Sequence, residues 1–391
     1  MSQRLELVEL ACVKGCNLTL LCRRFGISRK TAYKWLARYR SEGAGALEDQ
    51  SRRPHRSPRR LEAPMQQRVI DLRRQHPAWG GRKLAARLKA CGCSGVPSPS
   101  TITRVLRDAE LLDPGLCAQN RPWQRFEHAC ANDLWQMDFK GHVPLSGGGR
   151  CHPLTVLDDH SRYALVLAAC PGESGGVVRT HLINAFRRYG LPRRILSDNG
   201  APWGNCGQGQ AIAPWSRLSV WLMRLGIAVA HGRPAHPQTQ GKEERFHRTL
   251  VAEVLRWRTF TDLTDAQRQL DPWRTIYNHQ RPHEALGMQV PAQRYTPSPR
   301  PYPEAMPTVE YGTGDLVRQV RSNGRIQFRG QMVPVGTAFR GEPVALRATR
   351  EEGLMDVYYC SSRIGQIDQR ESPMSIQPVR ALTPLAGKVS G

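Results

Sequence analysis

Residues 130–295 show strand-like segments followed by helix-like and strand-like segments in alternation. The first three strand candidates are LWQMDFKGHVPL, HPLTVLDDHS and RYALVLAAC, which polar turns separate. After them come the helix candidate GGVVRTHLINAFRRYG, the strand RRILSD, the helix SRLSVWLMRLG, the strand IAVAHG and the long helix TQGKEERFHRTLVAEVLRW. Consecutive strands joined to such an alternation predict a mixed α/β sheet covered by helices.

Three acidic residues lie in separate motifs of this region: Asp138 in LWQMDFKGH, Asp198 in ILSDNGAPWG and Glu244 in HPQTQGKEERFHRTL. Two strand aspartates and a helical glutamate can meet at one edge of a sheet. Carboxylate oxygens are the ligands that Mg²⁺ prefers, and two such ions can clamp the attacking and leaving oxygens of a phosphodiester displacement. Taken singly, each acid is more simply a turn former or a solvated helix residue.

The sequences around the three acids favour a metal-binding role over these simpler interpretations. The strings MDFKGH, LTVLDDHSRYAL, SDNGAPWG, HGRPAHPQTQGKEERFHRTL and YNHQRPHEALG resemble the DDE transposases of bacterial insertion sequences, which are relatives of retroviral integrases. The resemblance covers roughly residues 1–300. It implies a ribonuclease H-like core, and it places the catalytic and metal-binding triad on Asp138, Asp198 and Glu244. It also implies two Mg²⁺ ions as the cofactor, which Mn²⁺ can replace.

Two features depart from the usual pattern of that family. Glu243 precedes Glu244, where similar sequences more often carry an apolar residue, so the third ligand stays open between them; Glu244 is preferred because it directly precedes RFHRTL. The gap between Asp198 and Glu244 also exceeds the spacing typical of the superfamily. The excess fits an insertion around GNCGQGQAIAPWSRL, which one subgroup of these transposases carries.

Composition indicates a nucleic-acid partner. The chain of 391 residues has a formal net charge of +24 and a sequence pI near 10.3, with the strongest excess in residues 1–130. A ribosomal or histone-like protein can be as basic, but it would not need a large core that contains tryptophan. The odd number of cysteines, 11, without a repeated C-x-x-C pair favours reduced thiols. With no apolar run that could span a bilayer and no signal peptide, we expect the bacterial cytosol.

Residues 1–50 are predicted to form a helix-turn-helix, because NLTLLCRRFGISRKTAYKWLARYRSEG has helical periodicity on both sides of Gly26. The start of its second helix would meet DNA base edges. The candidate DNA-binding residues are Ser28, as the cap, with Arg29, Lys30, Tyr33 and Lys34. A generic basic helical hairpin is the alternative.

A basic, proline-rich linker at 51–61 follows, in which Arg52 and Arg53 are candidate phosphate contacts. Residues 62–115 are predicted to form a second helical DNA-binding module, with Ser100 as a helix cap and Arg104 as a contact. A subdomain with only a packing role is the alternative for this module.

Within the core region, several polar residues near the glutamates are candidate contacts to DNA: His236, Gln238, Lys242, Arg245 and Arg248. For the cations among them, pairing with Glu244 is an equally good interpretation. Residues 305–385 contain alternating segments punctuated by glycine, which predict a small all-β, barrel-like domain. The predicted fold class is therefore multidomain, with all-α modules, an α/β core and an all-β end.

The resemblance implies a DNA transposase. Such an enzyme binds the terminal inverted repeats of a mobile element, nicks them to free 3′-hydroxyls and joins these to target DNA. Because two ends must be joined, we expect a homodimer or a larger homo-oligomer on double-stranded DNA, without a membrane. A metal-dependent nuclease that cuts without joining is one alternative, and a catalytically inactive DNA-binding regulator is another.

Overall fold

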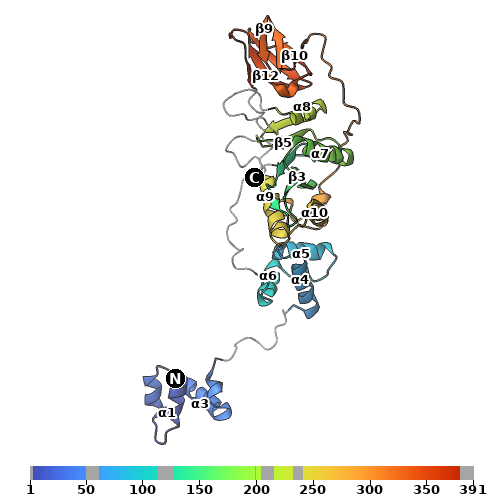
Figure 1. The fold of residues 1–391 in the computed structure, drawn as a ribbon. Helices are drawn as coiled ribbons and strands as arrows, with labels where there is room; N and C mark the ends of the chain where they lie inside the picture. The colour runs from blue at the N-terminus through green and yellow to red at the C-terminus, as the bar shows by residue number, and fades with distance from the viewer. Residues whose placement is uncertain are drawn as a thin grey trace. The chain divides into compact units, whose positions relative to one another are not determined.

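A computed structural model describes residues 3–49, 61–112, 127–198, 200–203, 215–231 and 241–378. By its internal contacts, the chain divides into two units, Met1–Leu61 and Glu62–Gly391. Figure 1 shows the elements of both units, coloured along the chain. Among the described helices, none has the length and apolar character needed to cross a membrane.

The first unit is a small helical bundle that contains a helix-turn-helix. Its elements are α1 (Gln3–Cys12), α2 (Leu18–Arg24), α3 (Arg29–Glu42) and the 3-10 turn η1 (Ala44–Leu47). Gly26 adopts a φ of +61° between α2 and α3, which glycine does without strain. The Ser28 hydroxyl accepts the Thr31 N–H at 3.2 Å and caps α3. The predicted helix-turn-helix is therefore confirmed.

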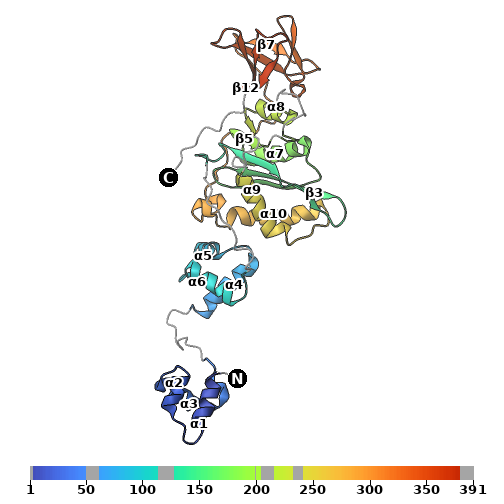
Figure 2. The ribbon, with the colours of Figure 1, turned by 90° about the vertical axis from the view of Figure 1, so that its left-hand side faces the viewer.

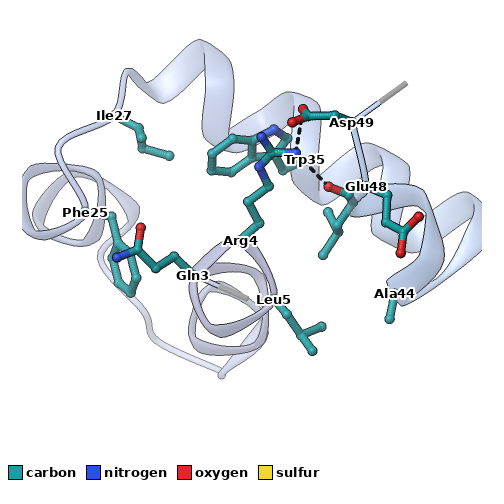
Figure 3. A pocket seen from close by; sticks show the side chains of 10 residues that line it. Gln3, Arg4, Leu5, Phe25, Ile27, Trp35, Ala44, Glu48 and Asp49 are labelled. Atoms are coloured by element: carbon teal, nitrogen blue, oxygen red, sulfur yellow. Dashed lines mark hydrogen bonds and ion pairs between the residues drawn. The ribbon is translucent and has the colours of Figure 1, made fainter. Parts of the chain in front are cut away.

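Arg4 ties α1 to the segment at and just after η1 (Figure 3). Its guanidinium donates to the Leu47 carbonyl at 2.9 Å, lies 2.8 Å from the Asp49 carboxylate and stands 5.3 Å from the centre of the Trp35 ring. The apolar core beneath it consists of Leu7, Val8, Leu21, Cys22, Ala32, Leu36 and Leu47. The Arg4 contacts and this core together hold α1 against α3 and η1.

The second unit begins with a helical module of α4 (Ala63–Gln75), α5 (Gly81–Ala90) and α6 (Pro99–Asp108). The predicted cap at Ser100 is wrong: Ser98 caps α6 by accepting the Thr101 N–H at 3.2 Å, because Pro99 suits the first helical position, where no N–H is needed. The module contacts the rest of the unit through Ile276, which packs on its core, and through Arg87, which donates to Gln280 at 3.2 Å.

The middle of the unit is a mixed sheet. Its strands are β1 (Trp135–Phe139), β2 (Val143–Pro144), β3 (Arg150–Asp158), β4 (Ala164–Cys170), β5 (Arg194–Ser197) and β6 (Ala228–His231). β3 pairs antiparallel with β1, β2 and β4, whereas β5 pairs parallel with β1 on one side and β6 on the other. The predicted mixed α/β sheet is confirmed.

Helices cover both faces of this sheet, as Figure 2 shows. They are α7 (Gly175–Tyr189), α8 (Arg217–Arg224), α9 (Gly241–Leu250), which continues into a π-helical turn (Val251–Leu255), and α10 (Leu263–His279). Trp135, Met137 and Phe139 of β1 share a core with α7 and α8, while α9 and α10 share another core with β3 and β4 on the opposite face. Because side chains alternate along a strand, Asp138 points to the face that carries α9.

The chain then passes through the 3-10 turns η5 (Glu284–Leu286) and η6 (Pro291–Gln293) to an all-β region. Its elements are β7 (Leu316–Gln319), β8 (Arg325–Phe328), β9 (Gln331–Pro334), η7 (Thr337–Phe339), β10 (Pro343–Ala348), β11 (Leu354–Tyr359), β12 (Ser362–Asp368) and β13 (Ile376–Pro378). The antiparallel sheet runs β13-β12-β11-β10-β7, and β8 pairs with β9. Val220 and Met223 of α8 belong to its core. The all-β prediction is confirmed.

Candidate active site

Asp138 and Asp198 lie at the same edge of the sheet. β1 and β5 are parallel neighbours, with Trp135 opposite Ile195 and Gln136 opposite Leu196, so their carboxyl ends point the same way. Asp138 is the fourth of the five residues of β1, and Asp198 comes directly after β5. Two strands that are far apart in the sequence thus bring these predicted ligands to the same edge.

Burial raises the pKa of both aspartates, and the charge of Asp198 adds to the shift of Asp138. Burial, and then the charge of Asp198, raises the pKa of Asp138 to about 6. Burial also raises the pKa of Asp198. Each carboxylate accepts a backbone N–H: Asp138 from Phe139 at 2.8 Å, and Asp198 from Gly200 at 3.1 Å. The pair is therefore a site where negative charge is costly and a cation would be stabilising.

The two glutamates of α9 differ in their surroundings. Glu243 is 0% exposed, and its Oε2 accepts the Thr155 hydroxyl at 2.9 Å. Burial, and then the charge of Asp138, raises its pKa well above the usual value. Glu244 has 61% of its side chain exposed and lies 3.1 Å from Arg248. The structure therefore places Glu243 against the sheet beside Asp138 and turns Glu244 toward solvent.

Thr155 and His247 complete this corner, and sequence reasoning assigned a role to neither of them. Thr155 is opposite Asp138 in the β1–β3 ladder, and its hydroxyl lies 3.0 Å from the Asp138 carbonyl and 2.8 Å from His247 Nε2. His247 Nδ1 is 3.9 Å from Asp138 Oδ2. Burial lowers the pKa of His247 to about 4, so its ring is neutral near pH 7. His247 lies in the RFHRTL run and Thr155 in the LTVLDDHSRYAL string, but only the sheet register shows that Thr155 stands opposite Asp138.

Lys242 belongs to the scaffold. It pairs with Asp159, whose carboxylate also accepts the His128 N–H at 2.9 Å and the Gln136 amide at 2.7 Å. Only 18% of the Lys242 side chain is exposed, and burial lowers its pKa to about 8. A buried carboxylate already binds the Lys242 ammonium, so a contact with DNA, which stays a prediction, would require the ammonium to leave Asp159.

The other DNA-binding candidates fall into two groups. Those with exposed side chains are Ser28, Arg29, Lys30, Tyr33, Lys34, Arg104, Arg245 and Arg248. Those outside the described residues are Arg52, Arg53, His236 and Gln238. The hydroxyl of Ser28 serves as the cap of α3, and Arg248 pairs with Glu244, so these two are already engaged.

The donor set agrees in kind with a hard divalent cation, since carboxylate oxygens are what Mg²⁺ and Mn²⁺ bind. The charge of Asp198 raises the pKa of Asp138, and a bound cation would relieve that repulsion. Among the described residues, no three His, Cys, Asp or Glu side chains are arranged so that they could hold a metal ion together. In this conformation neither glutamate of α9 therefore completes a three-carboxylate site with Asp138 and Asp198.

Family models match most parts of the chain. An integrase core domain matches residues 128–237, and a second integrase core model matches 225–291. A helix-turn-helix domain matches 3–55, and a homeodomain-like domain matches 31–106. The C-terminal domain of the IS481 family transposases matches residues 315–374.

Similar proteins come from bacterial insertion elements. The 39.2 kDa protein of IS476 from Xanthomonas euvesicatoria is 29% identical over 58% of this chain, which spans 63% of that relative. The 31.7 kDa protein of IS407 from Burkholderia multivorans is 27% identical over 58% of this chain and 78% of the relative. A protein of IS136 from Agrobacterium fabrum is 31% identical over 34% of this chain and 67% of the relative.

Two solved structures are similar to this chain. One is the simian T-cell lymphotropic virus intasome in complex with the PP2A regulatory subunit B56 gamma, at 16% identity, 81% of this chain, 99% of that chain and a TM-score of 0.36. The other is the HTLV-2 integrase catalytic core domain in complex with magnesium, at 13% identity, 42% and 97% coverage and a TM-score of 0.30. On the family models and the insertion-element relatives, the chain belongs to the bacterial insertion-sequence transposases of the DDE and integrase superfamily.

Proposed function

We propose that this chain is a DNA transposase that nicks the ends of a mobile element and joins the freed 3′-hydroxyls to target DNA. The observation that carries the proposal is the placement of Asp138 and Asp198 at one carboxyl edge of the sheet, with a helix that bears two glutamates packed beside them. Fold alone does not define an activity. Family membership and this carboxylate edge together favour phosphodiester chemistry on DNA.

Asp138, Asp198 and Glu244 would hold divalent cations, Mg²⁺ or Mn²⁺. Glu244 is preferred to Glu243 because Mg²⁺ keeps several of its waters, and only Glu244 faces solvent. When bound, such ions activate the attacking oxygen and stabilise the leaving oxygen. Glu243 is the alternative third ligand, since it lies nearer to Asp138.

The protein's own groups orient these carboxylates. The Phe139 and Gly200 N–H groups fix the directions of the Asp138 and Asp198 side chains. Thr155 and His247 pack beneath Asp138. Such outer hydrogen bonds keep ligands in place and so reduce the reorganisation that the reaction would otherwise require.

DNA recognition is assigned to the exposed start of α3, with Arg29, Lys30 and Lys34, and to α6, with Arg104. Helix starts of this kind can enter the major groove. The formal net charge of +24 supplies sequence-independent attraction to phosphate. Because two ends must be joined, the active form would be a homodimer or larger assembly on DNA.

The test is to incubate the full-length protein with labelled terminal-repeat DNA, with and without Mg²⁺. We expect nicked ends and, with target DNA, joined products on a denaturing gel. Asp138→Asn and Asp198→Asn should lose both products while still binding the ends. Nicking without joining would instead identify a nuclease, and specific binding without nicking would identify a regulator. Full activity of Asp198→Asn would overturn the assignment of the site.

A further inference from the structure

His231 closes the strand edge from which Asp198 emerges. It is the last residue of β6 and lies opposite Ser197, the last residue of β5, in a parallel pair. Asp198 is therefore the first residue beyond the paired strands. The His231 side chain is 8% exposed, and its ring stands 5.8 Å from that of Trp215. These contacts hold the imidazole in place next to the predicted metal ligand.

The imidazole binds the main chain of Asp198 rather than its carboxylate. His231 Nδ1 is 3.0 Å from the Asp198 carbonyl oxygen, and the Ser197 hydroxyl donates to the same oxygen at 3.3 Å. Because a carbonyl oxygen can only accept, this contact is a hydrogen bond when Nδ1 carries the hydrogen. The other ring nitrogen, Nε2, is buried and has no hydrogen-bond partner within the described part of the chain.

Asp198 is thus fixed at two points. His231 holds its carbonyl, which continues the hydrogen bonding of the sheet one residue past the last strand pair. Gly200 holds its carboxylate, through an N–H bond to Oδ1 of 3.1 Å. A Cβ added to Gly200 would stand 3.3 Å from Asp198 Oδ2, so the turn also lies close to this carboxylate. The two bonds together define both the backbone and the side-chain direction of Asp198.

We propose that His231 is a positioning residue, which aims the Asp198 carboxylate at the metal site by holding the Asp198 carbonyl through Nδ1–H. It contacts neither substrate nor metal itself. Outer-shell partners of metal ligands typically contribute about 10- to 100-fold to metal affinity or activity. The inference rests on the proposed function for its DNA readout, but its metal-binding readout is independent of any reaction.

A matched pair of variants tests the hydrogen bond. His231→Asn places an amide N–H near the position of Nδ1–H, whereas His231→Leu has the same shape as Asn without a donor. We expect His231→Leu to bind Mn²⁺ about 10- to 100-fold more weakly than wild type in calorimetric titrations, and to need correspondingly more Mg²⁺ for nicking. His231→Asn should stay within about threefold of wild type. Binding of end DNA in EDTA should be the same for all three proteins.

Equal Mn²⁺ affinities for His231→Leu and wild type would overturn the proposal, and so would equal losses for Leu and Asn. A second measurement does not depend on either variant: in ¹⁵N-histidine-labelled wild type without metal, His231 should show a protonated Nδ1. A bare Nδ1 would refute the proposed bond. If the wild type binds Mn²⁺ as expected but nicks no DNA, the proposed function fails while the role of His231 stands.

Discussion

Glu243 offers the sharpest test of how this site is built. Its side chain is fully buried, and in the described part of the chain its Oε1 makes no hydrogen bond of normal length and angle, although the Leu157 N–H is close enough to lower the pKa of Glu243. We predict that Glu243→Met, which keeps the unbranched shape, stabilises the protein. Removing an unsatisfied buried polar atom gains about 1–3 kcal/mol, and losing the bond from Thr155 costs about 0.5–1.5 kcal/mol. Thr155 keeps the Asp138 carbonyl as an acceptor at 3.0 Å, so the substitution leaves it with a partner.

The effect should depend on pH. The folded-state pKa of Glu243 is raised above its ordinary value of 4.5 by burial and by Asp138. A group of this kind contributes its stability below the unfolded-state pKa, and that stability is lost as the pH rises toward the folded-state pKa. The wild type is therefore penalised more at pH 8 than at pH 5. The advantage of Glu243→Met should be about 1 kcal/mol at pH 5 and larger at pH 8.

Scanning calorimetry of the full-length protein in EDTA would measure this difference. For a domain of about 150–250 residues, such as the α/β core, a change of about 1 kcal/mol in stability corresponds to roughly 2–4 °C in Tm. EDTA is present so that bound metal does not add stability of its own. Glu244→Met is the matched control, because its exposed side chain should leave Tm almost unchanged. A Glu243→Met protein that is less stable than wild type, or whose advantage is the same at both pH values, would refute the reasoning.

Three further predictions concern activity, recognition and packing. Glu244→Gln should abolish nicking of end DNA while Glu243→Met retains most of it; the reverse result in the gel assay would make Glu243 the third ligand. Arg29→Ala should weaken discrimination between cognate and random DNA by about 1–3 kcal/mol if it makes a bidentate base contact, and equal losses on both DNAs in a binding titration would make it a phosphate contact. Gly81→Ala should destabilise the α4–α6 module by about 1–3 kcal/mol, because its Cβ would lie 2.5 Å from the Pro99 carbonyl oxygen; an unchanged calorimetric profile would contradict the close approach of α5 and α6.

The two glutamates of α9 show what the local sequence pattern can predict and what it cannot. Glu243, Phe246, His247 and Leu250 fall on one helical stripe, since they are spaced by three or four residues. The structure buries all four of them. That stripe, present in the sequence, already indicates that Glu243 faces the sheet. The resemblance to known motifs points instead to Glu244, so the sequence identifies both residues without deciding between their roles.

Local pattern by itself determined the kinds of element in this protein and their order. Strand alternation placed Asp138 in β1, and Gly26 with Ser28 defined the turn of the first module, because these signals come from residues only a few positions apart. Even so, the predicted cap at Ser100 is wrong, because Pro99 occupies the first helical position and Ser98 caps α6.

Only the tertiary structure decided which side chains meet. The Thr155 hydroxyl binds Glu243, which is 88 positions away in the sequence, and His231 binds the Asp198 carbonyl, which is 33 positions away. Lys242 pairs with Asp159, which lies 83 positions away in the sequence. Such contacts depend on strand order and on the register of the β1–β3 and β5–β6 pairs. A register shift of one residue would turn Asp138 to the opposite face, and no short stretch of sequence specifies that register.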